Sequence, residues 1–411
     1  MGKRDKHPSP AASPPRVRYL LCTRWKAALI LSLLEGGGIA GSASLVIAQR
    51  SLMPSADPTT VVEPFHRVHS IRALADGRVL VGEWWSPGLT VVDVRSGRVE
   101  PVALPGVHTP GAREEVSRVL ALTGDSTLVE DRRNGRWHLL SGTRVVGTVA
   151  SVSRPGRGPN LIGADRTGDV LELRGFVYAG QRPNGFLRIP ETADSTLLLR
   201  YRRAPARSAA SARSDVDTLA RLRGRWRGAR TVYHGSFRGA PLRFELQNPL
   251  AVEEQAVLFP DGWVALVRLE PYHVEWITPT RQRIVGPPLP NPMILVDSLQ
   301  MRHAIHVYSK GGGLLEDFAP SDFPAWPSVL PPFHNDALLA SPSGLLLIRR
   351  TADARRSVTA YDIIDRQGHL TGRLELQLHE RVVGFGPRSM YVVAKRKDGQ
   401  EQLRIHQWRL E

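Results

Sequence analysis

The sequence predicts an all-β protein, a six-bladed β-propeller with an N-terminal signal or anchor segment and two insertions. Two observations support this fold class. After residue 60 the chain consists of short apolar runs, rich in β-branched residues and alternating in polarity, which is typical of antiparallel strands. In addition, a turn signal followed by an apolar strand, first seen in "LADGRVLVG" around Gly77, recurs along the chain.

Six copies of this phrase can be aligned on their turns. Glycine suits the turn position because it adopts a positive φ without a Cβ clash. Three of the five intervals between copies are about 44–48 residues long, which fits four short strands with their turns. The copies centre on Gly77, Gly124, Gly168, Gly262, Gly344 and Arg388.

A fixed period of this size in an all-β chain predicts one four-stranded blade per repeat. A single blade has two apolar faces that it cannot bury alone, so blades pack radially and the ring closes. We expect "TVVEPF", residues 60–65, to close the ring by pairing with the last blade, which ends in "QLRIHQWRL". Val79 and Val81 should face one neighbouring blade and Leu80 the other, because side chains alternate along a strand.

The predicted organisation has four parts. These are a basic leader (1–26), a signal peptide or membrane anchor (27–50), a spacer (51–60) and the propeller (61–411), with insertions at about 202–230 and 291–326. The first insertion is arginine-rich and low in bulky apolar residues, so we expect a mobile loop. In the second, Asp297 or Ser298 is expected to cap a short helix that ends at Gly311.

Two stretches carry family features. "SRPGRGPNLIGADRTGDVLEL", Ser153 to Leu173, has a glycine-rich lead-in to a strand, and "VTAYDIIDRQGHLTGRLEL" has a turn between outer strands at Asp365–His369. With the repeats, they resemble six-bladed propellers of the NHL and TolB-like type found in bacterial envelope proteins. The resemblance covers about Val61 to Leu410 and implies the fold. Such propellers serve as binding modules, scaffolds and enzymes, so it does not settle the activity.

The formal charge of +16 is concentrated in two places. Residues 1–26 hold seven basic residues against one aspartate, and residues 200–230 hold ten arginines against two aspartates. The rest of the chain is close to neutral and lacks a basic face interleaved with stacking aromatics, so we expect no nucleic-acid partner. The Arg200–Arg230 stretch is instead a candidate docking loop for an anionic partner.

The apolar run Ala27–Leu34 has basic flanks and is followed by small residues, as in a secretory signal. Cleavage is expected after Ala43 or Gln49; an uncleaved segment would tether residues 27–49 in the inner membrane. Either outcome predicts export to the periplasm or cell surface. The alternative is a cytoplasmic protein whose start is misassigned. The single cysteine, Cys22, allows no disulfide within the chain.

Several kinds of catalytic motif are absent from the sequence. It has no Gly-x-Ser-x-Gly elbow and no phosphate-binding Gly-x4-Gly-Lys-Ser/Thr, and "PGRGPNL" lacks the third glycine of a dinucleotide site. His66 and His69 would point to opposite faces of a strand, and His303 with His306 has no third ligand nearby. The strand tryptophans, including Trp263 and Trp276, are expected to pack between blades.

One set of residues is brought together by the fold itself. The inner strand of each blade lines a central channel, so polar residues where those strands begin converge at one mouth. This predicts a ligand site of His69, Glu115, Asn160, Glu254, His334, Asp336 and Glu380. No cofactor is expected, although the carboxylates would suit calcium.

We therefore expect an exported propeller that acts as a non-catalytic ligand- or protein-binding scaffold in the cell envelope. The alternative is a metal-dependent, lactonase-like hydrolase with its site at the same mouth, where the carboxylates would hold the ion.

Overall fold

A computed structural model describes the chain from residue 50 onwards, with gaps. The described residues are 50–52, 58–61, 64–83, 88–105, 116–131, 136–150, 161–174, 195–202, 216–223, 230–237, 240–309, 318–323 and 325–408. They belong to one compact unit, Ala48–Glu411. The predicted leader and signal segment up to residue 49 lie outside the described residues. Within the described part, no helix is long and apolar enough to cross a membrane.

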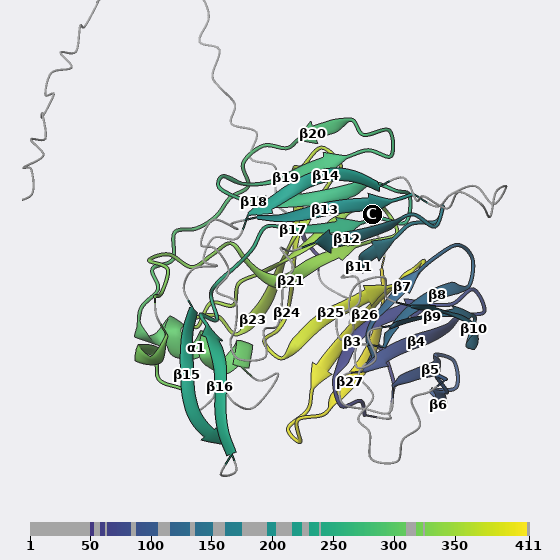
Figure 1. Cartoon of the computed structure of the whole chain (residues 1–411), viewed down its shortest axis with the longest axis horizontal. Coiled ribbons are helices and arrows are strands. Elements are labelled where there is room, and N and C mark those ends of the chain that lie inside the picture. Colours follow the sequence, from purple (N-terminus) through teal and green to yellow (C-terminus); the bar gives the residue numbers. More distant parts are fainter. Residues whose placement is uncertain are drawn as a thin grey trace, which may run out of the picture. The chain divides into compact units, whose positions relative to one another are not determined.

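Six antiparallel sheets follow one another along the chain (Figure 1). Blade 1 contains β3 (Val68–Ala73), β4 (Arg78–Glu83), β5 (Leu89–Asp93) and β6 (Val99–Val102). Blade 2 contains β7 (Val116–Ala121), β8 (Ser126–Asp131), β9 (Arg136–Ser141) and β10 (Arg144–Ala150). Blade 3 contains β11 (Leu161–Ala164), β12 (Val170–Arg174), β13 (Ser195–Tyr201) and β14 (Val216–Arg223).

The second half of the chain repeats this plan. Blade 4 contains β17 (Gln255–Leu258), β18 (Val264–Leu269), β19 (Tyr272–Ile277) and β20 (Arg283–Val285). Blade 5 contains β21 (Phe333–Ala340), β22 (Leu346–Arg350), β23 (Val358–Ile364) and β24 (Leu370–Gln377). Blade 6 contains β25 (Glu380–Phe385), β26 (Ser389–Lys395) and β27 (Glu401–Gln407).

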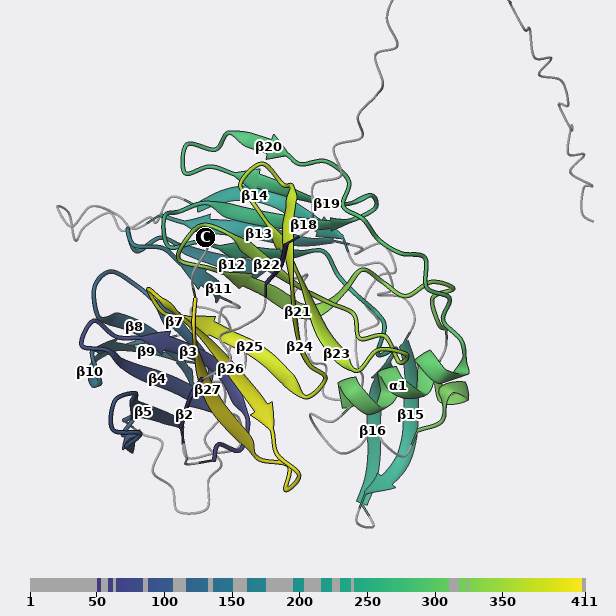
Figure 2. The ribbon, with the colours of Figure 1, turned by 180° about the vertical axis from the view of Figure 1, so that it is seen from behind.

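The first strands of the six blades form a closed ring. β3 contacts β7, which is followed in turn by β11, β17, β21 and β25, and β25 contacts β3 again. This circular order of inner strands defines a six-bladed β-propeller and confirms the predicted fold class (Figure 2).

The ring is closed by the N-terminal segment. β2 (Thr59–Thr60) pairs antiparallel with β27, and Phe65 forms a bridge with Glu401, so blade 6 takes its outer strand from the other end of the chain. This confirms the predicted pairing of residues 60–65 with the last blade. In addition, β1 (Arg50–Leu52) adds in parallel to β24, where Arg50 lies opposite Gly372.

The recurring turn connects the first and second strands of each blade. Gly77, Gly168, Gly262 and Gly344 have φ between 84° and 90°, and Gly124 has a φ of 55°. Only glycine adopts these angles without strain, which explains why the phrase repeats. The outer turn predicted at Asp365–His369 is also present, with Gly368 at a φ of 83°.

The apolar core lies between the blades. Val79 and Val81 pack against Val393 and Leu403 of blade 6, whereas Leu80 packs on the other side with residues of blade 2. The expected alternation on β4 is therefore confirmed. Comparable clusters lie between blades 2 and 3, 3 and 4, 4 and 5, and 5 and 6.

The insertions differ in part from expectation. The stretch predicted as one arginine-rich loop contains β14, whose Ala220 and Leu222 are buried while Arg221 and Arg223 face outward, a strand pattern hidden by the arginines. A further hairpin, β15 (Arg230–Phe237) with β16 (Ala240–Gln247), precedes blade 4.

The second insertion holds α1 (Ser298–Ser309) and a short 3-10 turn, Pro320–Asp322. Asp297 Oδ1 accepts a hydrogen bond from the Gln300 N–H at 3.0 Å, which is the predicted N-terminal cap.

Blades 4 and 5 touch through two glycines, which yields a stability prediction. A Cβ on Gly286 would lie 2.7 Å from Gly368 Cα and 2.9 Å from Val274 O. Backbone atoms cannot move aside as the end of a flexible side chain can. Gly286→Ala should therefore lower the free energy of unfolding by about 2 kcal/mol. Gly147→Ala is the control, since a Cβ there meets nothing within 4 Å. Urea denaturation of both variants measures the difference; equal midpoints would contradict it.

Candidate ligand site at the channel mouth

The structure describes five of the seven predicted site residues. His69 lies on β3, His334 and Asp336 on β21, and Glu380 begins β25, while Glu254 directly precedes β17. All five therefore stand where inner strands begin, as expected. Glu115 and Asn160 lie outside the described residues.

The pKa of His69 reflects the charged side chains around the channel mouth. Its pKa is lowered to about 4, first by burial and then by the charges of Arg118, Arg381 and Arg67, which together outweigh the opposing effect of Asp336. These residues come from blades 1, 2, 5 and 6, so the ring does bring charged side chains from different blades to one place. Asp336 also acts on His334, so His69, His334 and Asp336 are the predicted site residues that share it.

Asp336 projects from a bulge in β21. The pairing of β21 with β22 shifts register between Phe333 and Leu338, and Asp336 has a φ of 57°, rare for a residue other than glycine. Gln255 holds the bulge: its side chain donates to His334 O at 2.7 Å and accepts from the Ala337 N–H at 3.0 Å. Asp336 is exposed. Strained backbone of this kind is concentrated at functional sites.

His334 is held against the chain that precedes blade 4. Its Nε2 lies 3.1 Å from Pro249 O and its Nδ1 lies 3.0 Å from Asn335 O. Burial and the charge of Arg349 lower its pKa to about 4, although the two carbonyls and Asp336 act in the opposite direction. His334 thus supports the bulge that carries Asp336.

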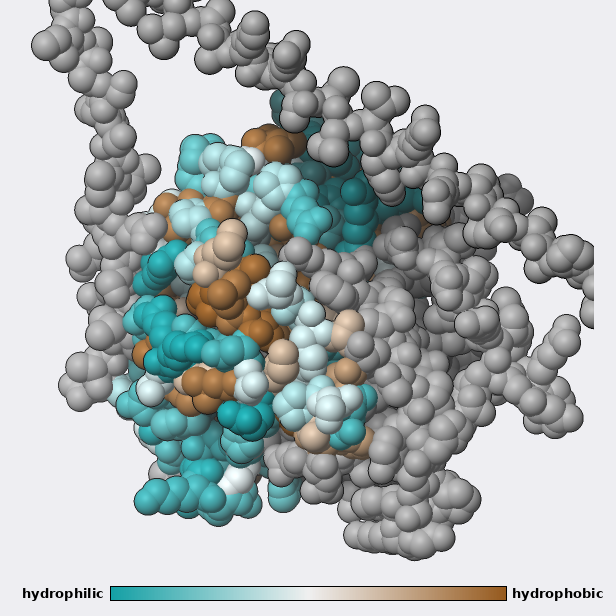
Figure 3. All heavy atoms as spheres, turned by 90° about the vertical axis from the view of Figure 1, so that its left-hand side faces the viewer, coloured by the Kyte–Doolittle hydropathy of each residue, from teal (hydrophilic) through white to brown (hydrophobic). Residues whose placement is uncertain are grey.

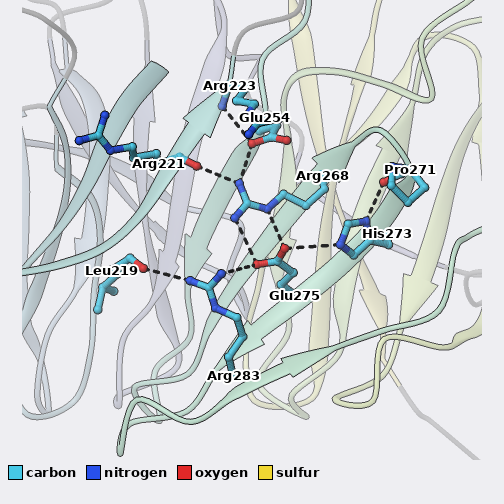
Figure 4. Close-up of polar contacts among 9 residues, drawn as sticks. All are labelled: Leu219, Arg221, Arg223, Glu254, Arg268, Pro271, His273, Glu275 and Arg283. Carbon is cyan, nitrogen blue, oxygen red and sulfur yellow. Dashed lines mark hydrogen bonds and ion pairs between the residues drawn. The ribbon is translucent and has the colours of Figure 1, made fainter. Parts of the chain in front are cut away.

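Glu254 belongs to an ion-pair network between blades 3 and 4 (Figure 4). Its Oε2 accepts from Arg268 at 2.6 Å and from the Arg223 N–H at 2.9 Å. Arg268 also binds both oxygens of Glu275 at 3.1 Å and donates to Arg221 O at 2.9 Å. The pKa of Glu275 is lowered because Arg268, Arg283 and His273 outweigh its desolvation. This geometry joins neighbouring blades.

Glu380 is engaged in a similar way. It pairs with Arg404 and accepts from the Gln377 N–H at 3.1 Å, which ties the end of blade 5 to the start of blade 6. Among the described residues, no group of three or more His, Cys, Asp or Glu side chains is arranged to hold a metal ion. Glu115 and Asn160, which complete the predicted set, are not among those residues.

Among the described residues, the charged side chains that act on His69 are mainly cationic: Arg67, Arg118 and Arg381, with Asp336 as the carboxylate. Arg67 is itself affected by Arg349, Arg381, Glu401 and Asp336. Arg381 is fixed by Glu401 at 2.9 Å and by Val68 O, and Arg118 donates to Leu161 O at 2.6 Å. These arginines do not stand out in the sequence because arginine occurs throughout the chain.

Arg200, the first residue of the predicted docking stretch, is buried. It binds Asp165 at 2.8 Å and Asp169 at 3.0 Å, and it donates to Gly262 O of blade 4. It is therefore part of the fold and not of a docking surface. Residues 203–215 and 224–229 lie outside the described residues.

The tryptophans of blade 4 pack as expected. Trp276 is fully buried and meets Trp263 edge-on, with ring centroids 6.1 Å apart. The guanidinium of Arg366, from the outer turn of blade 5, lies over both rings and over Phe259, and it pairs with Asp261 at 3.0 Å. These rings fill an interface between blades.

Comparison with known proteins finds similar solved structures but no matching sequence family. No protein-family model and no curated protein sequence matches it. It is similar to a putative gluconolactonase (TM-score 0.43, 10% identity, covering 87% of this chain and 94% of that one). It is also similar to regucalcin, a calcium-binding protein from Agrobacterium tumefaciens (TM-score 0.36, 11% identity, covering 88% of this chain and 97% of that one). Virginiamycin B lyase from Staphylococcus aureus is a third example (TM-score 0.37, 9% identity, covering 86% of this chain and 89% of that one). These similarities concern the fold alone.

The network around Glu254 gives a prediction that separates a structural role from a ligand role. Glu254→Gln leaves the largely buried guanidinium of Arg268 with one carboxylate fewer, so the free energy of unfolding should fall by about 3 kcal/mol. Glu100→Gln, at an exposed pair with Arg98, should change it by less than about 0.5 kcal/mol. Chemical denaturation of both variants checks this. An unchanged stability for Glu254→Gln would show that the carboxylate is not needed for the fold.

The two histidines predict a pH dependence. Their pKa values of about 4 in the folded protein lie below the ordinary 6.5. The unfolded chain therefore binds more protons, so this stabilisation is complete above pH 6.5 and is lost as the pH falls towards 4. Each histidine contributes a slope of up to about 1.4 kcal/mol per pH unit. The free energy of unfolding, measured at pH 7, 6 and 5, should decline less steeply in the variant with His69→Asn and His334→Asn than in the unmodified protein. An identical slope would refute the assignment.

Proposed function

We propose that this propeller is a non-catalytic binding module that takes up an anionic ligand at the channel mouth. The observation that carries the proposal is the charge around His69: among the described residues, three arginines (Arg67, Arg118 and Arg381) and one carboxylate (Asp336) act on it. The ligand would be a small carboxylate or phosphate compound, or an acidic side chain of a protein partner. Guanidinium groups bind both oxyanions in a planar, two-pronged geometry.

The fixed position of the arginines supports binding. Arg381 and Arg118 are held by backbone carbonyls of neighbouring blades, so little side-chain freedom remains to be lost when a ligand arrives. The inner strands that carry them belong to a closed ring of sheets. A rigid scaffold with charged groups at one mouth is suited to recognition.

The pKa of His69 argues for binding over acid–base catalysis. A general base works best with a pKa near the operating pH, and a pKa of about 4 leaves this imidazole a weak proton acceptor at neutral pH. A bound anion would raise that pKa, because it would stabilise the imidazolium.

We further propose that the module works outside the inner membrane, in the periplasm or at the cell surface. This rests on the signal-like segment at residues 27–49. N-terminal sequencing of protein recovered from its source cells should find a start near Leu45 or Arg50 if the segment is cleaved, or an intact N-terminus in the membrane fraction if it is retained as an anchor. An intact Met1 on a cytoplasmic protein would refute export.

Asp336→Asn distinguishes the anion site from the metal-dependent hydrolase. Asparagine tolerates positive φ as aspartate does, so the bulge should survive. Removing the exposed negative charge should tighten the binding of citrate or inorganic phosphate about fivefold, which corresponds to roughly 1 kcal/mol. Titration calorimetry measures this, with glucose as the neutral control.

The hydrolase alternative predicts the opposite behaviour. Calcium would raise the melting temperature of the unmodified protein, Asp336→Asn would abolish that rise, and anions would have no effect. That combination would overturn the proposed function.

A further inference from the structure

An apolar segment follows blade 4 on the outside of the propeller. We call residues 284–296 the apolar strap: it contains four prolines and no charged residue. The exposed fractions are 62% for Val285, 80% for Met293 and 68% for Leu295. Leu299, nearby on α1, is 45% exposed. Most of the exposed large apolar side chains in the described part of the chain are thus in or beside one short segment. Contiguous exposure of this kind marks an interaction surface.

The backbone of the strap is fixed along its length. The Gly286 and Leu289 N–H groups donate to Val274 O and Tyr272 O of β19, at 2.9 and 2.7 Å. Further on, Leu330 N–H donates to Ile294 O at 2.8 Å and Val296 N–H to Ser328 O at 3.0 Å. The exposed side chains are therefore held in place.

Alternation directs these side chains outward. Ile294 and Val296 pack into a small core with Leu250, Ala304 and Leu330. Because neighbours on an extended chain point to opposite sides, Met293 and Leu295 face away from that core. Outward positions on a sheet usually carry polar residues, so apolar residues here are informative. Figure 3, which faces the side of the molecule where α1 lies, shows apolar surface gathered among hydrophilic residues.

The N-terminal segment reaches the propeller next to the strap. Gly286 packs against Gly368, at the turn that begins β24, and β1 pairs with β24 just beyond that turn, with Arg50 opposite Gly372. The membrane anchor predicted for an uncleaved chain, residues 27–49, ends directly before Arg50 of β1. Such a chain would hold this edge of the propeller next to the bilayer.

Arginines flank the strap. Arg281 and Arg283 precede it and stay about half exposed although they pair with Asp217 and Glu275. Arg302 is exposed on α1, one turn after Leu299 on the same face. Apolar side chains with a basic rim suit the interface of a membrane that contains anionic lipids.

We propose that the apolar strap rests on an anionic phospholipid bilayer, with Met293 and Leu295 below the headgroups and the flanking arginines among them. The contact would orient the propeller on the membrane that its N-terminal segment is predicted to meet. It is separate from the channel mouth and does not depend on the identity of the ligand there.

Site-specific depth measurement on the full chain tests this contact. Cys22→Ser removes the single thiol, and Met293→Cys then accepts an environment-sensitive fluorophore. The protein is reconstituted in vesicles of phosphatidylcholine and phosphatidylglycerol (7:3) that carry nitroxide quenchers on their acyl chains. The label at 293 should lose at least half of its emission. A label at Val146→Cys, which is also exposed (54%) but lies on β10, should lose less than a tenth.

A charged variant provides the second arm. With the label at Leu299→Cys, quenching should fall at least threefold when Met293→Asp and Leu295→Asp are introduced, whereas Val146→Asp should leave it unchanged. Vesicle-bound protein whose label at 293 is not quenched would overturn the proposal. So would a blue shift at 293 that depends on protein concentration without lipid, because it would identify a second copy of the chain as the occupant.

Discussion

The structure depends on the fact that no blade can bury its own surface. Each four-stranded sheet presents apolar side chains to both sides, as β4 does with Val79 and Val81 on one face and Leu80 on the other. The apolar clusters consequently lie between blades, and each is completed only when the next blade is in place. Burial of apolar surface contributes roughly 25 cal/mol per Å². A missing neighbour would expose a whole face and remove this contribution. This requirement brings the inner strands into a ring, and the ring brings His69 and Asp336 to one mouth.

Arginine has a recurrent role in this arrangement. Arg72 on β3 donates to carbonyls in the first turn of blade 2, Arg118 reaches blade 3, Arg200 reaches blade 4 and Arg381 reaches blade 1. A guanidinium has five donors in a rigid plane, so it can satisfy a carboxylate and a neighbouring carbonyl together. Part of the basic character of the chain thus joins blades. At the channel mouth the same arrangement leaves an excess of positive charge.

The fold could be predicted because its signals are local. Glycine at positive φ, alternation along β4 and the spacing of turns can all be recognised within a few residues of each other. The site was harder because its contacts join distant residues: Arg381 meets Val68, and Arg118 meets Leu161. The sequence could place Glu254 and Glu380 at the starts of inner strands, but not reveal that Arg268 and Arg404 bind them. The parallel pairing of β1 was also missed, because three residues carry no pattern.

The pairing of β2 with β27 has a consequence for the order in which the protein assembles. β2 is made before every blade strand, and its partner β27 is made after all the others. Until then blade 6 lacks strands and blade 1 has one uncovered face, so the ring stays open until all six blades have been made. A propeller that cannot close earlier remains loosely folded for longer, and such exposure invites aggregation.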